Sequence, residues 1–326
     1  MNHPRLDSSE RSTEDDRATK LPFGIVASSV TPATAMGELR TDLVGPHIEW
    51  LIAEGVSGIS PLGSSGEFVA LSSDQRRRVL DEVLEVVSGR VHVMAGTHHY
   101  STHEAIALSR YAEAAGADSL LVVPPYYMCP SAEQVMDHYR LIAGSVGIPI
   151  VLYHNAAGSR VDLSTDHLAQ LVAEGTIAGV KMSNADPDRI RQLLDTTDRC
   201  RIYAGIDAVA FEALCHGAHG WISGIPSLVP RKARDLYEAI AVHNDLVKAR
   251  VLWRELAPLM RFQFQAFLGK GRGPQWMSVM KAALNLIGPP VGQPILPLQP
   301  LAEGDQKALM VILESLGYSI HGGVPN

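Results

Sequence analysis

The hydrophobic positions along the chain follow two alternating patterns. Short β-prone runs that end in Gly, Ser, Pro or Thr are each followed by a longer segment with apolar residues at helical spacing. The expected strands cover residues 24–30, 58–63, 91–97, 119–125, 149–155, 177–183, 201–206 and 220–224. The expected helices cover residues 42–54, 73–87, 102–115, 132–143, 165–174, 188–195, 208–216 and 231–241. Eight strand–helix units in series predict the α/β class, in the form of a (β/α)8 TIM barrel.

The alternative to a barrel is an open, doubly wound sheet. That fold carries a nucleotide-binding glycine loop after its first strand, where this chain has SSVTPAT (28–34). Residues 1–20 are polar without an apolar period and are expected to form a mobile tail. Residues 21–243 are expected to form the barrel. The strands then stop, so residues 244–326 are expected to form a C-terminal helical extension packed on it.

Composition narrows the classes of partner. The formal net charge is −7 and there is no long basic run, which argues against nucleic acid or an anionic membrane surface. No apolar run reaches the roughly 18 residues of a membrane helix, and no signal-peptide pattern opens the chain. The three cysteines form neither a disulfide framework nor a Cys-x-x-Cys pair. We therefore expect a cytoplasmic protein without nucleic-acid or membrane partners.

The sixth expected strand ends in a lysine, Lys181, at the edge where a barrel places its active site. Apolar surroundings disfavour an ammonium group, and a neutral amine can attack a ketone to form a Schiff base. The protonated imine is an electron sink that permits carbon–carbon cleavage or loss of water. The alternative is a structural ion pair between Lys181 and an acid on the barrel rim.

The loop GSSGE (63–67) follows the second expected strand. Gly63 and Gly66 allow a tight turn whose backbone amides converge on a carboxylate or phosphate, and Ser64 and Ser65 add hydroxyl donors. An anion site and a lysine in one barrel mouth suit a pyruvate-type substrate, which has a carboxylate beside its ketone. The alternative is an ordinary strand-to-helix turn with a serine cap.

Tyrosines stand at two further strand ends. Tyr153 ends the strand beside that of Lys181, and Tyr126 and Tyr127 follow Pro124-Pro125 after the fourth strand. A phenol can donate and recover a proton when another hydroxyl relays it. Aromatic packing at the rim is the alternative for each tyrosine.

Taken together, these residues resemble a known family. Lys181 in GVKMS, the GSSGE loop, the PPYY pair and the YHN strand are similar in order and spacing to the dihydrodipicolinate synthase/N-acetylneuraminate lyase family of class I aldolases. The resemblance extends from about Pro22 through the final expected helix. It implies that Lys181 forms an imine with pyruvate or another 2-keto acid and that Tyr153 is the general acid/base. It also implies that Ser64 links Tyr153 to Tyr127 of a neighbouring subunit.

The resemblance implies further site residues and an assembly. Gly63, Ser64 and Ser65 would hold the substrate carboxylate, and Gly205 and Ile222 would line the pocket near the imine. Homotetramers built as dimers of dimers are usual in the family. No cofactor and no metal are implied.

The chain departs from the synthase branch after Tyr153. Gly158 occupies the position of an arginine that binds the incoming substrate, and Arg160 lies two residues later. Asn155 is a candidate for binding the hydroxyls of a sugar acid. We therefore expect a Schiff-base-forming lyase or aldolase that acts on pyruvate or a 2-keto-3-deoxy acid. The alternative is a dihydrodipicolinate synthase that condenses pyruvate with aspartate semialdehyde.

Two more distant functions remain. A metal-dependent barrel enzyme would use a His-x-His pair at the end of the first strand, which this chain lacks. The histidines near strand ends, among them His98 and His154, are instead interpreted as loop and surface residues. A non-catalytic binder of a 2-keto acid is disfavoured because both Lys181 and Tyr153 are present.

Overall fold

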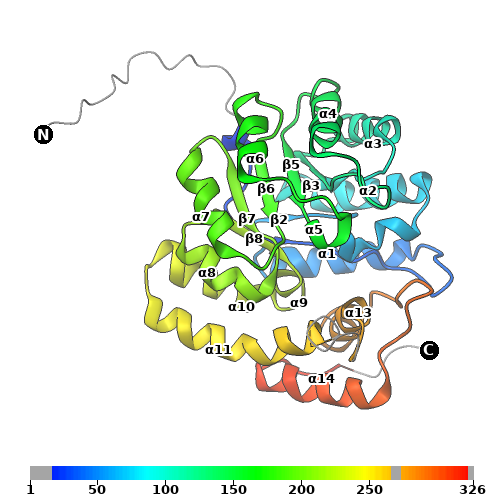
Figure 1. The fold of residues 1–326 in the computed structure, drawn as a ribbon. Coiled ribbons are helices and arrows are strands. Elements are labelled where there is room, and N and C mark those ends of the chain that lie inside the picture. Colours follow the sequence, from blue (N-terminus) through cyan, green and yellow to red (C-terminus); the bar gives the residue numbers. More distant parts are fainter. Residues whose placement is uncertain (1–16, 266–272, 322–326) are drawn as a thin grey trace, which may run out of the picture.

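The computed structural model describes residues 17–265 and 273–321. Eight parallel strands pair in chain order and close into a barrel, with helices around it (Figure 1). This confirms the predicted (β/α)8 fold. The strands are β1 (Gly24–Ala27), β2 (Gly58–Ile59), β3 (His92–Gly96), β4 (Ser119–Val122), β5 (Ile150–His154), β6 (Gly179–Met182), β7 (Arg201–Ala204) and β8 (Gly220–Ser223).

The longer helices of the outer layer lie where the apolar spacing predicts them. Three begin at a serine whose side chain accepts from the third helical amide, in reciprocal pairs of Ser72 with Gln75, Ser131 with Gln134 and Ser164 with His167. The helices are α1 (Val44–Ala53), α2 (Ser73–Val87), α3 (Thr102–Ala115), α4 (Ala132–Ala143), α6 (Thr165–Ala173), α7 (Pro187–Thr196), α8 (Ala210–Cys215) and α10 (Pro230–Tyr237), which continues into the π-helix η6 (Glu238–Val242).

The strands are shorter than predicted at their carboxyl ends. The residues between the observed and the predicted strand ends form turns, bends or irregular structure, and short helices follow several of these segments. These are the 3₁₀ helices η2 (Thr41–Leu43), η3 (Ser64–Gly66), η4 (Phe68–Ala70) and η5 (Asp207–Val209), together with α5 (Ala156–Ser159) and α9 (Ile225–Leu228). Apolar content alone cannot separate a strand from the loop that follows it, since both are buried here.

Two hydrophobic layers hold the fold together. One lies between the strands and the surrounding helices, and the other fills the barrel interior with side chains such as Val26, Met94 and Val151. Alternation along each strand decides which layer a residue joins. In this register Lys181 lies opposite Tyr153 on one side and Tyr203 on the other, so all three belong to the barrel interior.

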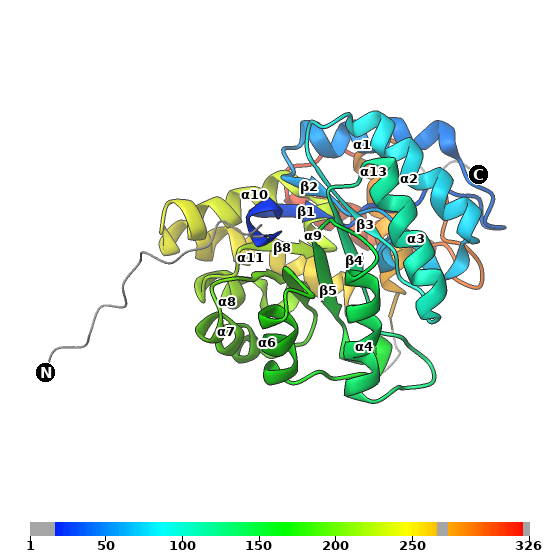
Figure 2. The ribbon, with the colours of Figure 1, turned by 90° about the horizontal axis from the view of Figure 1, so that it is seen from above.

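The N-terminal segment closes the amino end of the barrel. Residues 17–20, placed in the polar tail by the sequence analysis, instead form the 3₁₀ helix η1 (Arg17–Lys20, dark blue in Figure 2), and Ala18 is buried. Leu21 joins the interior layer, and the Tyr203 hydroxyl donates a hydrogen bond to the Pro22 carbonyl at 2.8 Å. The remainder of the expected tail, residues 1–16, lies outside the described residues.

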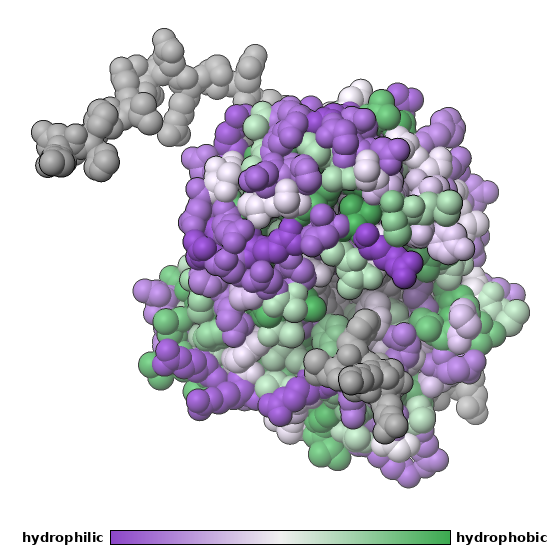
Figure 3. Space-filling view, viewed as in Figure 1, coloured by the Kyte–Doolittle hydropathy of each residue, from purple (hydrophilic) through white to green (hydrophobic). Residues whose placement is uncertain are grey.

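Three helices follow the barrel: α11 (Leu246–Gln263), α13 (Trp276–Ile287) and α14 (Glu303–Ser315). They pack on one another, and α13 also contacts α9 at the end of β8 (Figure 1). The lower half of the face in Figure 3, where these helices lie, shows more hydrophobic residues than the upper half. Most of the GKGRGP segment (269–274), expected to break the helices, lies outside the described residues.

Candidate active site

Lys181 is enclosed at the carboxyl end of β6. Its residue is 4% exposed, and its amine lies 4.0 Å from the centroid of the Tyr153 ring. An amine so placed contacts the electron-rich face of the phenol, which stabilises a cation without neutralising it. Within residues 17–265 and 273–321, no carboxylate forms an ion pair with Lys181, so the structural ion pair considered from the sequence is not found there.

Tyr153 is buried beside this amine and is surrounded by hydrogen-bonding groups. Burial by itself raises the pKa of the phenol, but the nearby Lys181 charge and hydrogen bonds with Ser64, Ser183 and Asn155 outweigh it. The net effect lowers the pKa of Tyr153 below its usual value. The Asn155 amide donates to the phenol oxygen at 3.3 Å. Tyr153 is therefore adapted to exchange a proton close to Lys181.

The GSSGE turn is built differently from the sequence interpretation. Gly63 and Gly66 have ordinary negative φ angles, and a Cβ at Gly63 would meet nothing within 4 Å. The left-handed residues are Leu62 (φ 61°) and Glu67 (φ 50°), which flank the turn. Non-glycine residues adopt this conformation only where their surroundings hold them. The prediction that the two glycines make this turn possible is therefore wrong.

The turn still offers hydrogen-bond donors at its start. The amides of Gly66 and Glu67 bond to carbonyls inside the turn, at 3.0 and 3.1 Å. The amides of Ser64 and Ser65 take no part in the hydrogen bonds found for the described residues. First-turn amides of a helix lack partners within the helix and favour an anion. This arrangement can bind a carboxylate, as the sequence predicts.

Gly205 and Ile222 line the layer next to Lys181. A Cβ at Gly205 would approach Lys181 Cγ to 2.9 Å and the Met182 carbonyl oxygen to 2.8 Å, so only glycine fits there. Ile222 is fully buried in the barrel interior. Ser183, which donates to the Gly205 carbonyl at 2.8 Å and reaches Tyr153, was missed from the sequence. Its position two residues after Lys181, on the same face of the chain, was the available signal.

The two tyrosines after β4 have different surroundings. Tyr126 packs its ring on Phe68, with centroids 6.0 Å apart. Tyr127 has a left-handed backbone (φ 78°) and an exposed fraction of 82%. Within one chain the structure does not bring Tyr127 to Ser64. The exposed Met128, Val69 and Tyr100 accompany Tyr127 on the loops and turns after β4, β2 and β3.

The loop after Tyr153 carries Asn155 and Arg160. Asn155 begins α5, and its side-chain oxygen accepts from the Gly158 amide at 3.1 Å while its amide reaches Tyr153. Arg160 ends α5 in a left-handed conformation (φ 61°) and is exposed. Asn155 therefore belongs to the hydrogen-bonding environment of Tyr153, whereas Arg160 is exposed.

Two histidines at strand ends are buried, His98 in the loop after β3 and His154 in β5, so their assignment to the surface is wrong. His98 is 0% exposed, its Nδ1 accepts from the Val123 amide at 2.9 Å, and its ring centroid lies 6.0 Å from that of Tyr153. Burial, with the charges of Arg76 and Lys181, holds the pKa of His98 well below its usual range. The ring is therefore neutral, with its proton on Nε2. His154 is also 0% exposed, and its Nε2 lies 3.2 Å from Asp162.

Asp207 follows β7 and is completely buried. Its Oδ1 accepts from the Trp221 indole at 3.0 Å and from the Ile225 amide at 3.2 Å. Burial raises the pKa of Asp207 to about 6, although these hydrogen bonds oppose the shift. The carboxyl group therefore ties η5 to β8 and α9 at the barrel mouth.

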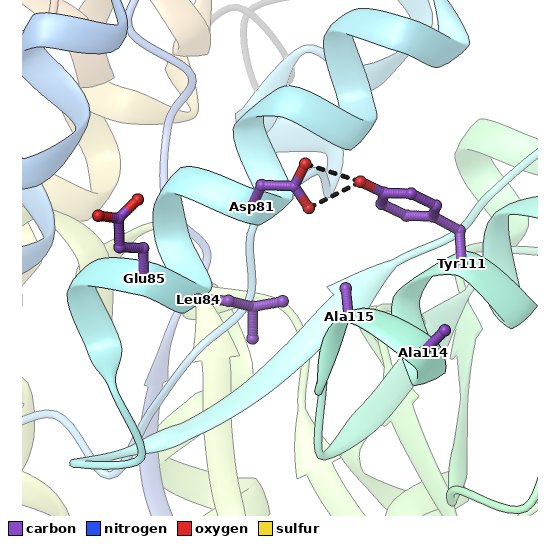
Figure 4. A pocket seen from close by; sticks show the side chains of 6 residues that line it. All are labelled: Asp81, Leu84, Glu85, Tyr111, Ala114 and Ala115. Carbon is purple, nitrogen blue, oxygen red and sulfur yellow. Dashed lines mark hydrogen bonds between the residues drawn. The ribbon is translucent and has the colours of Figure 1, made fainter.

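Other possible sites carry less chemistry. Among the described residues, no three His, Cys, Asp or Glu side chains are grouped so that they could hold a metal ion, and no described helix could span a membrane. The Tyr111 hydroxyl in α3 donates to Asp81 in α2 at 2.8 and 2.7 Å. These two residues border a surface hollow outside the barrel (Figure 4), whose lining comprises Asp81, Leu84, Glu85, Tyr111, Ala114 and Ala115. None of them comes from a strand end.

Comparison with known proteins gives a consistent result. Residues 21–316 match the model of the dihydrodipicolinate synthetase family. The 4-hydroxy-tetrahydrodipicolinate synthase of Methanoculleus marisnigri is 34% identical, over 90% of this chain and 99% of its own length. That of Ralstonia nicotianae is 34% identical over 90% and 97%.

Solved structures agree with this. Dihydrodipicolinate synthase from Agrobacterium tumefaciens has a TM-score of 0.84 at 30% identity, covering 92% of this chain and 99% of the other. The chloride-inhibited enzyme from Acinetobacter baumannii in complex with pyruvate has a TM-score of 0.81 at 31% identity, covering 91% and 100%.

Proposed function

The chain belongs to the dihydrodipicolinate synthetase family of class I aldolase-type lyases, and from that premise we propose that Lys181 forms a Schiff base with pyruvate or another 2-keto acid. The observation that carries this proposal is the enclosed Lys181 amine, 4.0 Å from the Tyr153 ring and without a described carboxylate partner. A similar protein was solved with pyruvate bound, which supports the same substrate class.

The proposed chemistry begins with residues of one subunit. The neutral Lys181 amine attacks the ketone carbon, and the ketone oxygen leaves as water while the carbon–nitrogen double bond forms. Tyr153 supplies and recovers the protons, because the Asn155 amide donates to its phenol oxygen and the Ser64 and Ser183 hydroxyls help to lower its pKa. The substrate carboxylate binds the Ser64 and Ser65 amides and hydroxyls, next to Gly63. Gly205 and Ile222 leave room for the imine.

The protonated imine then supports aldol-type chemistry. It stabilises the carbanion on the adjacent carbon, so a 2-keto-3-deoxy acid can lose an aldehyde or a water molecule. The second candidate reaction is a condensation, in which pyruvate joins aspartate semialdehyde. The names of the most similar relatives favour condensation. Gly158, in place of the synthase arginine, favours another second substrate. Asn155 and Arg160 are the residues we propose to meet that substrate.

We propose that the functional unit is a homotetramer assembled from dimers, in the cytoplasm. Tyr127 is 82% exposed, its neighbour in the chain Met128 is 67% exposed, and Val69 in η4 is 71% exposed. A partner subunit covering this surface would bury these side chains and would place its own Tyr127 near Ser64. The three hydroxyls of Tyr153, Ser64 and the partner's Tyr127 would then form the proton relay.

A substrate panel tests the reaction. Purified protein is incubated with a series of 2-keto-3-deoxy acids, or with pyruvate plus aspartate semialdehyde, and pyruvate release or uptake is measured. We expect turnover with at least one substrate and none in Lys181→Arg. Turnover only in the condensation assay would select the synthase reaction. Equal turnover by wild type and Lys181→Arg would contradict the proposal.

A further inference from the structure

A buried ion pair connects the GSSGE turn to the C-terminal extension. Lys281 Nζ in α13 lies 2.5 Å from Glu67 Oε2, and their side chains are only 1% and 4% exposed. Lys281 also donates to the Gln293 carbonyl at 2.6 Å. The other oxygen of Glu67 accepts from the Ile295 amide at 2.8 Å. The C-terminal segment thus holds both carboxylate oxygens of Glu67.

Glu67 lies two residues after Ser65, the second of the two serines that we propose to bind the substrate carboxylate. Its backbone is left-handed, and its amide donates to the Ser64 carbonyl at 3.1 Å. On the other side of the turn, the Thr31 hydroxyl donates to the Gly66 carbonyl at 2.8 Å. A left-handed conformation is unfavourable for a non-glycine residue, so its surroundings must hold it in place. Among these restraints, the ion pair with Lys281 is the one between opposite charges.

Stability alone is a poor explanation for this pair. Removing two charges from water costs several kcal/mol per ion, and apolar side chains of similar volume often serve equally well. Burial lowers the pKa of Lys281 although Glu67 opposes the shift, which indicates that the enclosure is unfavourable for the ammonium. A charge-assisted hydrogen bond constrains geometry, however, because it holds the Glu67 carboxylate in one position and orientation. Positioning of Glu67 therefore explains the ion pair better than stabilisation of the fold does.

We infer that Lys281 is a positioning residue for the reaction: by fixing Glu67, it holds the Ser64–Ser65 turn in the geometry that binds the substrate carboxylate and reaches Tyr153. This inference rests on the proposed function. It assigns a role to the C-terminal extension, whose helix α13 lies outside the barrel but acts on the barrel mouth. Lys281 does not contact the substrate itself, so replacing it should change the affinity for the substrate and not the chemistry at Lys181.

The test replaces both charges together. Glu67→Leu combined with Lys281→Leu leaves no uncompensated buried charge, so folding stability should stay near that of wild type. The readout is the pyruvate concentration that gives half-maximal borohydride trapping at Lys181. We expect this concentration to rise at least about tenfold, with trapping still at Lys181. A folded double variant within twofold of wild type would overturn the inference.

A control separates positioning from general weakening of the extension. Leu313→Ala in α14 removes a fully buried side chain and should lower the urea midpoint of unfolding, without touching Glu67. Its half-maximal concentration should match that of wild type; an increase equal to that of the double variant would overturn the inference. If the double variant does not fold, Glu67→Gln replaces it, because glutamine keeps the size and the acceptor for Ile295. An increase of about threefold or more then supports the inference, and no change contradicts it.

The same assay distinguishes the two levels of the proposal. If wild type forms no adduct with pyruvate, the proposed function fails and the inference fails with it. If wild type forms the adduct but the variants bind pyruvate unchanged, only the positioning role of Lys281 fails.

Discussion

Lys181 and Tyr153 face each other on neighbouring strands, with the amine 4.0 Å from the centroid of the phenol ring. The barrel register produces this relationship, because β5 and β6 pair residue for residue and both side chains point inward. A nucleophile and an acid/base are therefore held together by backbone pairing, not by a flexible loop.

Tyr153→Phe tests the role of the phenol. The variant keeps the ring beside Lys181 but loses the exchangeable proton, so we expect kcat to fall by about 10²–10⁴ while the melting temperature changes little. Tyr203→Phe is the matched control on the other neighbouring strand, because its hydroxyl donates to the Pro22 carbonyl, at the amino end of the barrel and away from the mouth. The control should keep its activity. Comparable losses in both variants would refute the role assigned to Tyr153.

Two glycine substitutions should have opposite outcomes. A Cβ at Gly205 would press on Lys181 Cγ at 2.9 Å and on a backbone oxygen at 2.8 Å, so Gly205→Ala should displace the lysine and abolish imine formation. Gly63→Ala meets nothing within 4 Å and should remain within about 1 kcal/mol of wild-type stability, with turnover preserved. Activity and urea midpoints of both variants check this. A fully active Gly205→Ala would show that the space beside Lys181 is larger than the structure indicates.

The sequence predicts the barrel well, because each strand and helix has its own local apolar period. It also predicts Lys181, Tyr153 and the serine turn, since strand ends mark the mouth. It does not predict the contact between Glu67 and Lys281, which are distant in the chain and meet only through tertiary packing. Nor does it predict that Leu62 and Glu67, not the glycines, are left-handed. Burial of His98 and exposure of Arg160 depend equally on how loops fold back.

Arg160→Ala separates the two substrates. Because Arg160 is exposed whereas Lys181 is enclosed, the variant should trap pyruvate at Lys181 as readily as wild type. If Arg160 binds the second substrate, KM for that substrate should rise about tenfold or more, with kcat changed little. Steady-state kinetics with each substrate varied in turn measure both effects. A weakened response to pyruvate would instead place Arg160 at the imine.

Mixing experiments test the contribution of Tyr127. We expect Tyr127→Phe and Lys181→Arg each to be strongly impaired. In a mixed dimer, one site has an intact Lys181 and receives Tyr127 from the partner chain. Subunit exchange at equal amounts should therefore restore up to about a quarter of wild-type activity. If mixing restores nothing although mixed dimers form, Tyr127 does not act across subunits.

Asp207 should make stability depend on pH. Burial raises the pKa of its folded form to about 6, above the unfolded value, so its favourable contribution is present below about pH 4 and is lost as pH rises through 6. The loss is on the order of 3 kcal/mol. Stability of wild type relative to Asp207→Asn should therefore decrease from pH 4 to pH 7 in urea titrations. Parallel curves for the two proteins would show that Asp207 stays ionised throughout.

The most direct measurement is covalent trapping of the substrate. Protein is incubated with pyruvate and sodium borohydride, digested, and mapped by mass spectrometry. The account predicts one reduced pyruvate adduct on the peptide that contains Lys181, with the other buried lysine, Lys281, unmodified and no adduct in Lys181→Arg. An adduct on another residue, or undiminished turnover in Lys181→Arg, would contradict it.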